Sequence, residues 1–411
     1  MDFKAKKIAV IGGGAAGMMA AGTATLYGAS VTIFENTDRL GKKLAITGKG
    51  RCNVTNNCTI QEFLENVTKN PRFLYAALNA FDTESTMNFF EGLGVKLKTE
   101  RGNRVYPESD LAKDIVMAMR EYARGAEVIY NKVTAIKKST DGSFTVTAKN
   151  KDYVFDAVIL ATGGKSYPLT GSDGSGYRLA MRLGHSVTEL IPSLIPIESD
   201  SPLCKEMQGL SLRNVAITVT DQSGKTIYTD FGEMMFTHFG VTGPVILSAS
   251  AHLRGLDVSS LTLSIDLKPA LDEKTLDARL LSDFSEKSNK DFINSLGSLL
   301  PSKMILPFIK SLEIDEHKKV NSITKEERRA ILSKLKKFDI PLTSFRPIEE
   351  AIITSGGINV KEISPKDMQS KITPGLYFAG EVIDVDAYTG GFNLQIAFST
   401  GYLAGKSAAE S

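Results

Sequence analysis

The stretch K-K-I-A-V-I-G-G-G-A-A-G, from Lys6 to Gly17, decides the fold. Its first half is a run of apolar residues, which is typical of a buried strand. Gly12, Gly14 and Gly17 then fit the pattern G-x-G-x-x-G, and small residues continue as a predicted helix through Tyr27. In this pattern the first glycine allows a tight turn, the second lets the backbone approach a pyrophosphate, and the third lets the helix pack on the strand. The stretch therefore predicts a dinucleotide-binding unit.

The following strand adds a carboxylate to this unit. Residues 31–34 (V-T-I-F) predict the strand, which ends at Glu35, eighteen residues after Gly17. A carboxylate in this place accepts hydrogen bonds from ribose hydroxyls. Because it would repel a 2′-phosphate, we expect the adenosine of FAD or NAD rather than that of NADP. The alternative is a surface glutamate that merely follows a strand.

The run from Ile8 to Phe34 carries no charge and is long enough to resemble a membrane helix. Gly13 and Gly17 even form a G-x-x-x-G pair. Six glycines interrupt the run, however, and three of them are consecutive, which suits a lipid-facing helix poorly. We therefore expect a strand, turn, helix and strand here, and no membrane partner.

Composition indicates an ordinary globular protein. The 411 residues are 42% hydrophobic, which is enough for roughly two or three domains. Forty-nine Lys and Arg against 47 Asp and Glu give a net charge of +2, so we expect no nucleic-acid partner. Three cysteines are too few for a disulfide framework, and no secretory leader is recognisable, so the expected location is cytoplasmic. No metal site is expected, because His, Cys and acidic residues do not cluster at ligand spacing.

Two later strands end in motifs that favour FAD over NAD. One is D-A-V-I-L-A-T-G-G, from Asp156 to Gly164, and the other is G-L-Y-F-A-G-E, from Gly375 to Glu381. Both resemble motifs of the two-dinucleotide-binding-domain flavoproteins. In those proteins the first strand passes under the nucleotide, and the second ends in Gly-Asp beside the ribityl chain and pyrophosphate. Glu381 stands where Asp is usual. The resemblance implies FAD extended along one domain, because NAD-only domains lack this C-terminal return.

The segment L-G-K-K-L-A-I-T-G-K-G-R-C-N-V-T-N, from Leu40 to Asn56, follows the ribose-binding strand and should run alongside the cofactor. Disulfide reductases place a redox pair in this region, separated by four residues. Cys52 and Cys58 have five residues between them, and the last histidine is His317, far from a C-terminal His-Glu base. We interpret the segment as a wrap for FAD in which Cys52 is a small buried residue. A transient disulfide remains the alternative.

The chain also resembles a known bacterial family of FAD flavoproteins over nearly its whole length. Besides the wrap segment, the matching blocks are R-V-Y-P from Arg104, F-T-H-F-G-V-T-G-P from Phe236, I-T-S-G-G-I from Ile353, and G-L-Y-F-A-G-E-V-I-D-V-D-A-Y-T-G-G-F-N from Gly375. Members are described as aminoacetone oxidases or as NAD(P)/FAD-dependent oxidoreductases similar to the bile-acid 4,6-reductase. The resemblance implies FAD and a second domain inserted into the FAD domain, but it does not fix the substrate.

These features predict an α/β fold in which a Rossmann-like FAD-binding domain is interrupted by an insert. Residues 1–191 and 341–411 should form the FAD domain, residues 192–270 a β-rich insert, and residues 271–340 a small helical subdomain. Residues 127–160 predict a β-meander over the cofactor. We find no second Rossmann pattern, so NADH or NADPH, if it is the electron donor, would bind without a domain of its own.

The residues expected to hold FAD come from several segments. They are Gly12, Gly14, Ala15, Ala16 and Gly17; Glu35 and Asn36; Lys43, Leu44, Gly48, Gly50, Arg51, Cys52 and Asn53; Val133; Ala161, Thr162, Gly163 and Gly164; and Gly380, Glu381, Gly390, Gly391, Asn393 and Leu394. Val133 resembles the position whose backbone contacts adenine, although a core valine fits equally well. The helix that begins near Asn393 is expected to face the flavin ring with its N-terminus, because the reduced ring gathers negative charge.

His238 is the leading candidate for a substrate-side acid or base, because imidazole titrates in a suitable range. The alternative is that His238 aligns its own loop. Tyr388 is a second candidate proton donor. The leading hypothesis is an FAD-dependent oxidoreductase, either an oxidase or an NAD(P)H-dependent reductase, that acts on a small organic substrate at the interface of the FAD domain and the insert. The rivals are a dithiol reductase that uses Cys52 and Cys58, and a flavin-dependent protein that modifies or binds RNA. The sequence leaves the oligomeric state open.

Overall fold

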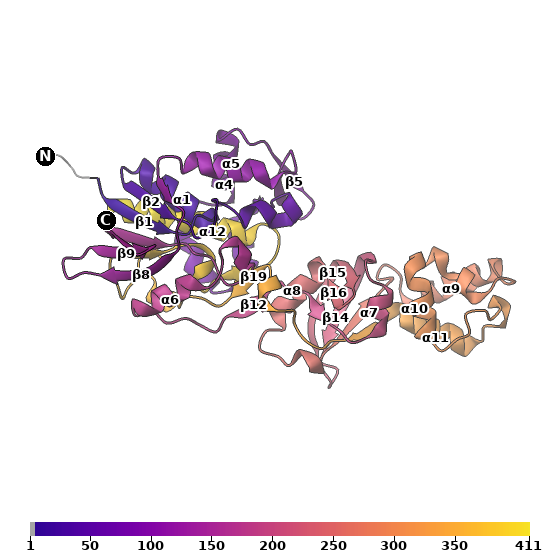
Figure 1. Cartoon of the computed structure of the whole chain (residues 1–411). Helices are drawn as coiled ribbons and strands as arrows, with labels where there is room; N and C mark the ends of the chain where they lie inside the picture. Colours follow the sequence, from indigo (N-terminus) through magenta and orange to yellow (C-terminus); the bar gives the residue numbers. More distant parts are fainter. Residues whose placement is uncertain (1–4) are drawn as a thin grey trace. The chain divides into compact units, whose positions relative to one another are not determined.

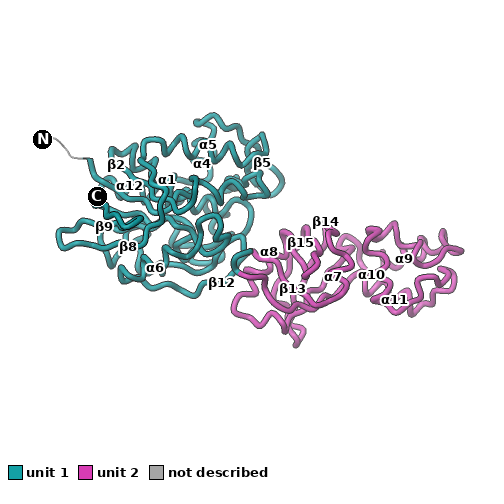
Figure 2. Tube along the Cα trace, in the orientation of Figure 1, with its two compact units in different colours: residues 1–193, 348–411 teal, residues 194–347 magenta. Residues whose placement is uncertain are grey.

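The computed structural model describes residues 5–411 and divides into two compact units. The first contains the chain up to Ser193 together with Ile348–Ser411, and the second contains Leu194–Pro347 (Figures 1 and 2). The second unit is therefore an insert in the first. The chain leaves and re-enters the first unit beside two short antiparallel strands, β12 (Ile191–Ser193) and β19 (Ile353–Ser355).

A five-stranded parallel sheet forms the centre of the first unit. Its strands in spatial order are β20 (Leu376–Phe378), β11 (Ala157–Leu160), β1 (Lys7–Ile11), β2 (Ser30–Phe34) and β7 (Glu127–Ile129). Along the chain, β2 and then β7 are added on one side of β1. The chain then crosses to the other side of β1, where it forms β11 and β20. Such a reversal is the topological switch point at which open α/β sheets bind ligands.

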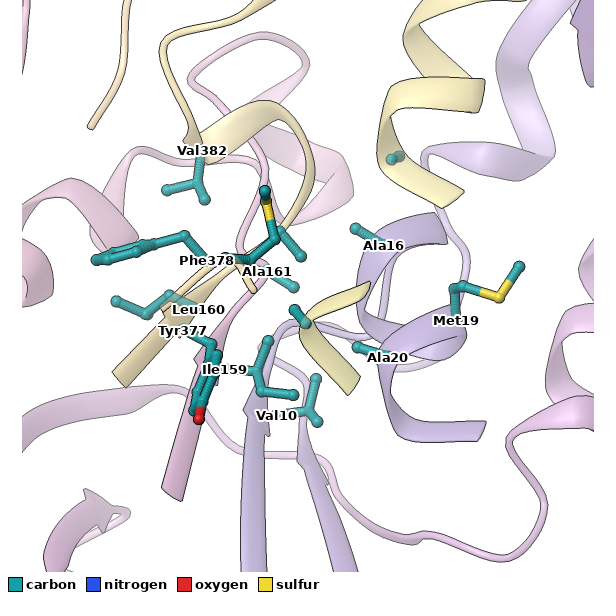
Figure 3. Close-up of a cluster of buried hydrophobic side chains, with 14 of the residues drawn as sticks. Val10, Ala16, Met19, Ala20, Ile159, Leu160, Ala161, Tyr377, Phe378 and Val382 are labelled. Carbon is teal, nitrogen blue, oxygen red and sulfur yellow. The ribbon is translucent and has the colours of Figure 1, made fainter. Parts of the chain in front are cut away.

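Every residue of β1 after Lys7, and every residue of β11 and β20, is buried, so both faces of this part of the sheet are covered. Val10 of β1 lies in register with Ile159 of β11, which in turn lies in register with Tyr377 of β20. Figure 3 shows these side chains beside Ala16 and Ala20 of the helix α1 (Ala15–Leu26). The uncharged run from Ile8 to Phe34 thus forms β1, α1 and β2. None of the helices within residues 5–411 is long and apolar enough to cross a bilayer.

Helix α12 (Phe392–Glu410), drawn in yellow, packs along α1, drawn in indigo (Figure 1). Glycines make this close contact possible. A Cβ atom at Gly401 would lie 2.5 Å from the carbonyl oxygen of Ala16, and one at Gly405 would lie 2.3 Å from that of Ala20. The last helix of the chain is thereby fixed to the first.

The predicted meander over residues 127–160 is partly wrong. Its first strand divides into β7, which joins the parallel sheet, and β8 (Val133–Lys138), and its last divides into β10 (Lys151–Phe155) and β11. Only β8, β9 (Phe144–Ala148) and β10 form an antiparallel sheet of their own. The division occurs because β7 and β11 pair with β2 and β1, which are distant in sequence.

The remaining elements of the first unit surround the sheet. They include the 3-10 turn η1 (Leu44–Gly50), the helices α2 (Ile60–Glu65), α3 (Tyr75–Ala80), α4 (Thr83–Gly92), α5 (Ala112–Tyr122) and α6 (Ser175–Arg182), the sheet of β3 (Thr55–Asn56), β6 (Arg104–Pro107) and β5 (Leu97–Glu100), and the pair of β21 (Asp386–Ala387) with β4 (Val67–Lys69).

The second unit combines an antiparallel sheet with helices. The sheet order is β13 (Ile197–Glu198), β16 (Gly240–Thr242), β15 (Thr226–Thr237), β14 (Ser211–Thr220), β17 (Thr262–Asp266) and β18 (Phe338–Pro341). Its helices are α7 (Pro202–Glu206), α8 (Pro244–His252), α9 (Glu273–Glu286), α10 (Ser302–Lys310) and α11 (Lys325–Lys336). One apolar core joins the sheet to the helices, and Phe308 of α10 stacks on Phe338 of β18 at 6.2 Å between ring centroids.

We expect Gly405→Ala to destabilise the protein by about 1–3 kcal/mol, because the added methyl group would overlap a backbone carbonyl that cannot move independently of α1. Gly92→Ala, at the end of α4, is the control. A Cβ atom at Gly92 would have no heavy atom within 4 Å, so the better helix propensity of alanine should leave stability unchanged or raise it by up to about 1 kcal/mol. Equilibrium unfolding in urea compares the two, and equal midpoints would contradict the α1–α12 packing.

Candidate cofactor and active site

The switch point brings two of the predicted motifs into contact. Gly12 follows β1 with a φ of +107°, and a Cβ atom there would lie 2.5 Å from the carbonyl oxygen of Ala161, which follows β11. A Cβ atom at Gly17 would lie 1.8 Å from the carbonyl oxygen of Gly12. At Gly14 no heavy atom lies within 4 Å of the Cβ position. Gly12 and Gly17 are thus required for packing, whereas Gly14 leaves open space at the N-terminus of α1, where phosphate groups are favoured.

Glu35 holds the glycine-rich turn from the end of β2. Its side chain is buried, and its two oxygens accept hydrogen bonds of 2.8 Å from the backbone N–H groups of Gly13 and Thr37. The neighbouring Asn36 donates a hydrogen bond of 3.1 Å to the carbonyl oxygen of Gly171. Each carboxylate oxygen has a further lone pair, so Glu35 can also accept hydrogen bonds from ribose hydroxyls. The structure thus gives Glu35 a role in shaping the turn that sequence reasoning missed.

The residues after β11 pack against the C-terminal segment. Gly163 has a φ of +69°, and a Cβ atom at Gly164 would lie 2.5 Å from the Thr354 hydroxyl and 2.8 Å from the Glu381 carboxylate. Glu381 accepts hydrogen bonds from Lys43 Nζ at 2.9 Å, from the Thr354 N–H at 2.8 Å and from the Ser166 hydroxyl at 3.2 Å. Three predicted residues, Lys43, Gly164 and Glu381, therefore meet here.

Sequence reasoning missed Ser166 and Thr354 as members of this cluster. Ser166 follows the A-T-G-G motif after one lysine, and Thr354 lies in the family block I-T-S-G-G-I. Their proximity to these motifs was the available signal.

The wrap segment forms the tight turn η1. Lys49 and Cys52 have left-handed backbone conformations, with φ values of 58° and 59°, and Gly48 has 57°. The side chain of Leu44 is buried in the core of the first unit, and Gly50 has open space at its Cβ position. These conformations curl the backbone back on itself instead of continuing a helix.

The Arg51 side chain forms an ion-pair network with two carboxylates. Its guanidinium donates hydrogen bonds to Glu100 and Asp110 and lies 4.2 Å from the ring centroid of Tyr106. The hydrogen bond from Arg51 lowers the pKa of Glu100, and those from Lys98 and Arg51 lower the pKa of Asp110. The Arg51 guanidinium therefore uses most of its N–H donors in this network.

Cys52 and Cys58, the pair of the alternative dithiol mechanism, are both held as thiols. Burial raises the pKa of Cys52 to about 12. Burial, together with the nearby Glu62 carboxylate, raises the pKa of Cys58 to about 11. The two residues form no disulfide. Because the thiolate is the reactive form in disulfide exchange, this environment disfavours a redox pair at neutral pH.

The N-terminus of α12 packs against the wrap. Gly391 has a φ of +96°, and a Cβ atom there would lie 2.3 Å from the backbone carbonyl group of Thr55. The carbonyl oxygen of Gly390 accepts a hydrogen bond of 3.1 Å from Asn56. The close approach that we expected for the flavin ring is thus made at Gly391 by β3 of the protein itself.

The Asn393 side chain closes a loop of the chain onto the first turn of α12. It accepts a hydrogen bond of 3.0 Å from the N–H of Ala387 and donates to the carbonyl oxygens of Ala387 at 2.7 Å and Tyr388 at 3.2 Å. Leu394 packs against the apolar core. The half-buried Tyr388 is thereby fixed beside this helix, and its N–H donates to the carbonyl oxygen of Asn66 at 3.0 Å.

The remaining predicted residues belong to other elements of the chain. Val133 begins β8 and is buried opposite Ala148 of β9. His238 lies in the second unit, at the exposed turn between β15 and β16, with its ring against Phe239. The structure places the two candidate proton donors, His238 and Tyr388, in different units.

A dinucleotide fits the buried polar groups of the first unit. Within residues 5–411, Asn53 Oδ1, Thr162 Oγ1 and the Tyr177 hydroxyl of α6 are buried without a hydrogen-bond partner. Buried polar atoms nearly always have partners, so these three are candidates to receive them from a ligand or from water. Asn53 and Thr162 belong to the segments predicted to line FAD. Together with the open space at Gly14, they suit a bound cofactor with many polar atoms.

Comparison with known proteins identifies the family. The family described as "HI0933-like protein Rossmann domain" matches residues 6–407. The chain belongs to this family. The "3-dehydro-bile acid delta(4,6)-reductase" of Clostridium scindens is 30% identical, with 98% of this chain and 99% of the relative covered. The "Ribosomal RNA dihydrouridine synthase" of Escherichia coli is 27% identical, with 96% and 95% covered.

Solved structures with the same fold include two that act on 3-ketosteroids. The 3-ketosteroid-delta4-(5alpha)-dehydrogenase of Rhodococcus jostii has a TM-score of 0.52 at 14% identity, with 100% of this chain and 99% of the other covered. The 3-ketosteroid delta1-dehydrogenase of Sterolibacterium denitrificans has a TM-score of 0.54 at 12% identity, with 98% and 100% covered. At these identities the likeness concerns the fold.

These findings confirm the family, the Rossmann-type fold and the enzyme class. The protein is an FAD-dependent oxidoreductase, as the sequence blocks predicted. The individual FAD contacts stay predictions that the packing of the first unit supports.

We expect Glu35→Gln to raise the dissociation constant of FAD about 10- to 100-fold, because the loss of a charged acceptor costs about 1.5–3 kcal/mol. The measurement is a titration of apoprotein with FAD, followed by protein fluorescence. Glu127→Gln is the control, since Glu127 is exposed on the neighbouring strand β7. Unchanged affinity in Glu35→Gln would contradict the ribose assignment.

We expect a Cys52→Ser, Cys58→Ser double variant to keep its FAD and its electron transfer from donor to acceptor, because both thiols are protonated at neutral pH. Steady-state turnover and flavin absorbance measure the two properties. Cys204→Ser, at a buried cysteine of the second unit, controls for the cost of placing a hydroxyl in a core. Loss of turnover with flavin still bound would restore the dithiol mechanism.

Proposed function

We propose that this enzyme reduces a carbon–carbon double bond that is conjugated with a carbonyl group. The proposal rests on two relatives that match this chain over nearly its whole length, because the names of both describe a reaction of this kind. A delta(4,6)-reductase of a 3-dehydro bile acid saturates ring double bonds that are conjugated with a 3-oxo group. A dihydrouridine synthase saturates the double bond of a uracil ring, which is conjugated with a carbonyl.

The reaction needs a hydride equivalent at one carbon and a proton at the other. Bound FAD in its reduced form would supply the hydride equivalent. As the new C–H bond forms at the carbon distal to the carbonyl, the electron pair of the double bond moves toward the carbonyl oxygen. A proton then completes the second C–H bond, so the substrate gains two electrons and two hydrogens. The protein must therefore bind the carbonyl and deliver this proton.

Two of the predicted residues are candidates to deliver the proton. Tyr388 is held by the backbone of Asn66 and by the side chain of Asn393, so its backbone position is fixed beside the cofactor-binding segments. His238 is exposed and can exchange protons with water. Tyr388 is the stronger candidate, because it lies in the same unit as the FAD motifs.

The electron donor is proposed to be NADH or NADPH. Within residues 5–411, the first unit has one parallel sheet, and the sheet of the second unit is antiparallel. A nicotinamide cofactor would therefore bind transiently, without a second Rossmann domain to hold its adenosine.

The leading substrate class is a small apolar molecule with a 3-oxo-4-ene group, in keeping with the 30% identical reductase. A uracil ring in ribosomal RNA is the second candidate, and it is favoured by relatives at 27% and 28% identity in Escherichia coli and Haemophilus influenzae. The balanced net charge of +2 supports the first class over a polyanion.

An anaerobic experiment tests the reaction and its substrate. The protein is reduced with NADPH or NADH, and then a 3-oxo-4-ene bile acid or ribosomal RNA that lacks dihydrouridine is added. We expect reoxidation of the flavin, seen by absorbance, and a product with two more hydrogens, seen by mass spectrometry. Tyr388→Phe should slow this second step and leave flavin reduction unchanged, whereas His238→Asn should affect neither. Reoxidation by oxygen alone, with no reaction toward any conjugated carbonyl compound, would contradict the proposal.

A further inference from the structure

Lys43 and Glu381 form an ion pair between segments that are more than three hundred residues apart. Lys43 Nζ lies 2.9 Å from Glu381 Oε2 and donates a second hydrogen bond of 2.8 Å to the hydroxyl of Ser166. Glu381 also accepts from Ser166 and from the N–H of Thr354. Four segments therefore contribute to the pair: Lys43 comes from the wrap segment, Ser166 from the loop after β11, Thr354 from β19, and Glu381 from the turn after β20.

The pair is mostly shielded from solvent. The exposed fractions of the two side chains are 22% for Lys43 and 21% for Glu381. An ammonium group has three N–H donors, and Lys43 uses two of them within residues 5–411. By contrast, the Glu381 oxygens accept three hydrogen bonds from the protein. The group that is left with a free donor is the cation.

The pair lies at the ligand-binding edge of the sheet. Gly380, which precedes Glu381, is so close to the first turn of α1 that a Cβ atom there would lie 2.7 Å from the Cβ of Ala16. Ser166 follows the carboxyl end of β11, and Glu381 follows that of β20. Ligands of open α/β sheets bind outside these carboxyl ends. The free donor of Lys43 is thus located at the edge where the predicted FAD motifs converge.

We propose that the Lys43 ammonium, held in place by Glu381 and Ser166, raises the reduction potential of the bound flavin. This inference rests on the proposed function and deepens it, because the potential decides how readily the flavin is reduced and how readily it reduces the substrate. A cation stabilises a ring that gains negative charge more than it stabilises the neutral ring. Glu381 has two opposing roles: it positions the cation, and its own negative charge offsets part of the effect.

Substitutions of Lys43 and of Glu381 distinguish an electrostatic effect on the flavin potential from a purely structural role of the ion pair. In Lys43→Met, we expect the affinity for reduced FAD to fall at least tenfold relative to that for oxidised FAD, which lowers the midpoint potential by about 30 mV for a two-electron couple. In Lys43→Arg, most of the effect should be restored. Glu381→Gln should shift the potential upward, because it removes a negative charge while its amide oxygen still accepts the Thr354 N–H.

The measurement is a dye-coupled anaerobic titration of each holoprotein, together with FAD titrations in both oxidation states. Lys318→Met is the matched control. Lys318 lies 2.7 Å from Glu327, with exposed fractions of 27% and 25%, but this pair is in the helical part of the second unit. Its loss should leave the potential unchanged. Should Lys43→Met lose FAD altogether, the milder Lys43→Gln provides the same comparison.

Two outcomes would overturn the proposal. Equal loss of affinity for both oxidation states in the Lys43 variants would assign the ammonium to a group whose charge does not change on reduction, such as the pyrophosphate. A downward shift in Glu381→Gln as well as in Lys43→Met would make the pair a structural clamp. Neither measurement uses a substrate, so they are independent of the test for double-bond reduction.

Discussion

Gly12 and Ala161 follow neighbouring parallel strands, and their backbones approach so closely that no side chain fits at Gly12. This contact exists because the strand order reverses between β1 and β11. It directs the glycine-rich turn and the A-T-G-G loop to the same edge of the sheet. The N-terminus of α1, the carboxylate of Glu35 and the cluster around Glu381 all take their positions from it. The site is thus a product of the sheet topology more than of any one side chain.

Local patterns predicted the parts of the fold that depend on neighbours in sequence. The strand, turn and helix from Lys7 to Leu26 follow from a short apolar run and from the spacing of Gly12, Gly14 and Gly17, which are local features of the sequence. The meander over residues 127–160 was partly wrong, because an apolar β-branched run shows that a strand forms but not which sheet it joins. Only distant pairing with β2 and β1 separates β7 and β11 from the antiparallel sheet.

In the candidate site too, local sequence patterns did not show which distant segments contact each other. Motifs located Lys43 and Glu381, but their ion pair joins segments that no local pattern connects, and Ser166 belongs to it without a motif of its own. Arg51 was expected at the cofactor, and its ion pairs with Glu100 at the end of β5 and with Asp110 after β6 were not foreseen. Charge pairing between distant segments decided both cases. Long charged side chains are consequently the least predictable members of such a site, whereas the glycines are the most predictable.

The way in which the insert interrupts the first unit has a consequence for synthesis of the chain. Strand β20 and helix α12 complete the parallel sheet and cover α1, but they emerge from the ribosome after the whole of the second unit. Until then the edge of β11 and the small-residue face of α1 have no cover, and exposed edges of this kind invite aggregation. The insert, whose core is contained in one continuous stretch, can fold during this interval. Final assembly of the nucleotide-binding unit therefore waits for the synthesis of β20 and α12, and chains truncated before these elements should depend on chaperones.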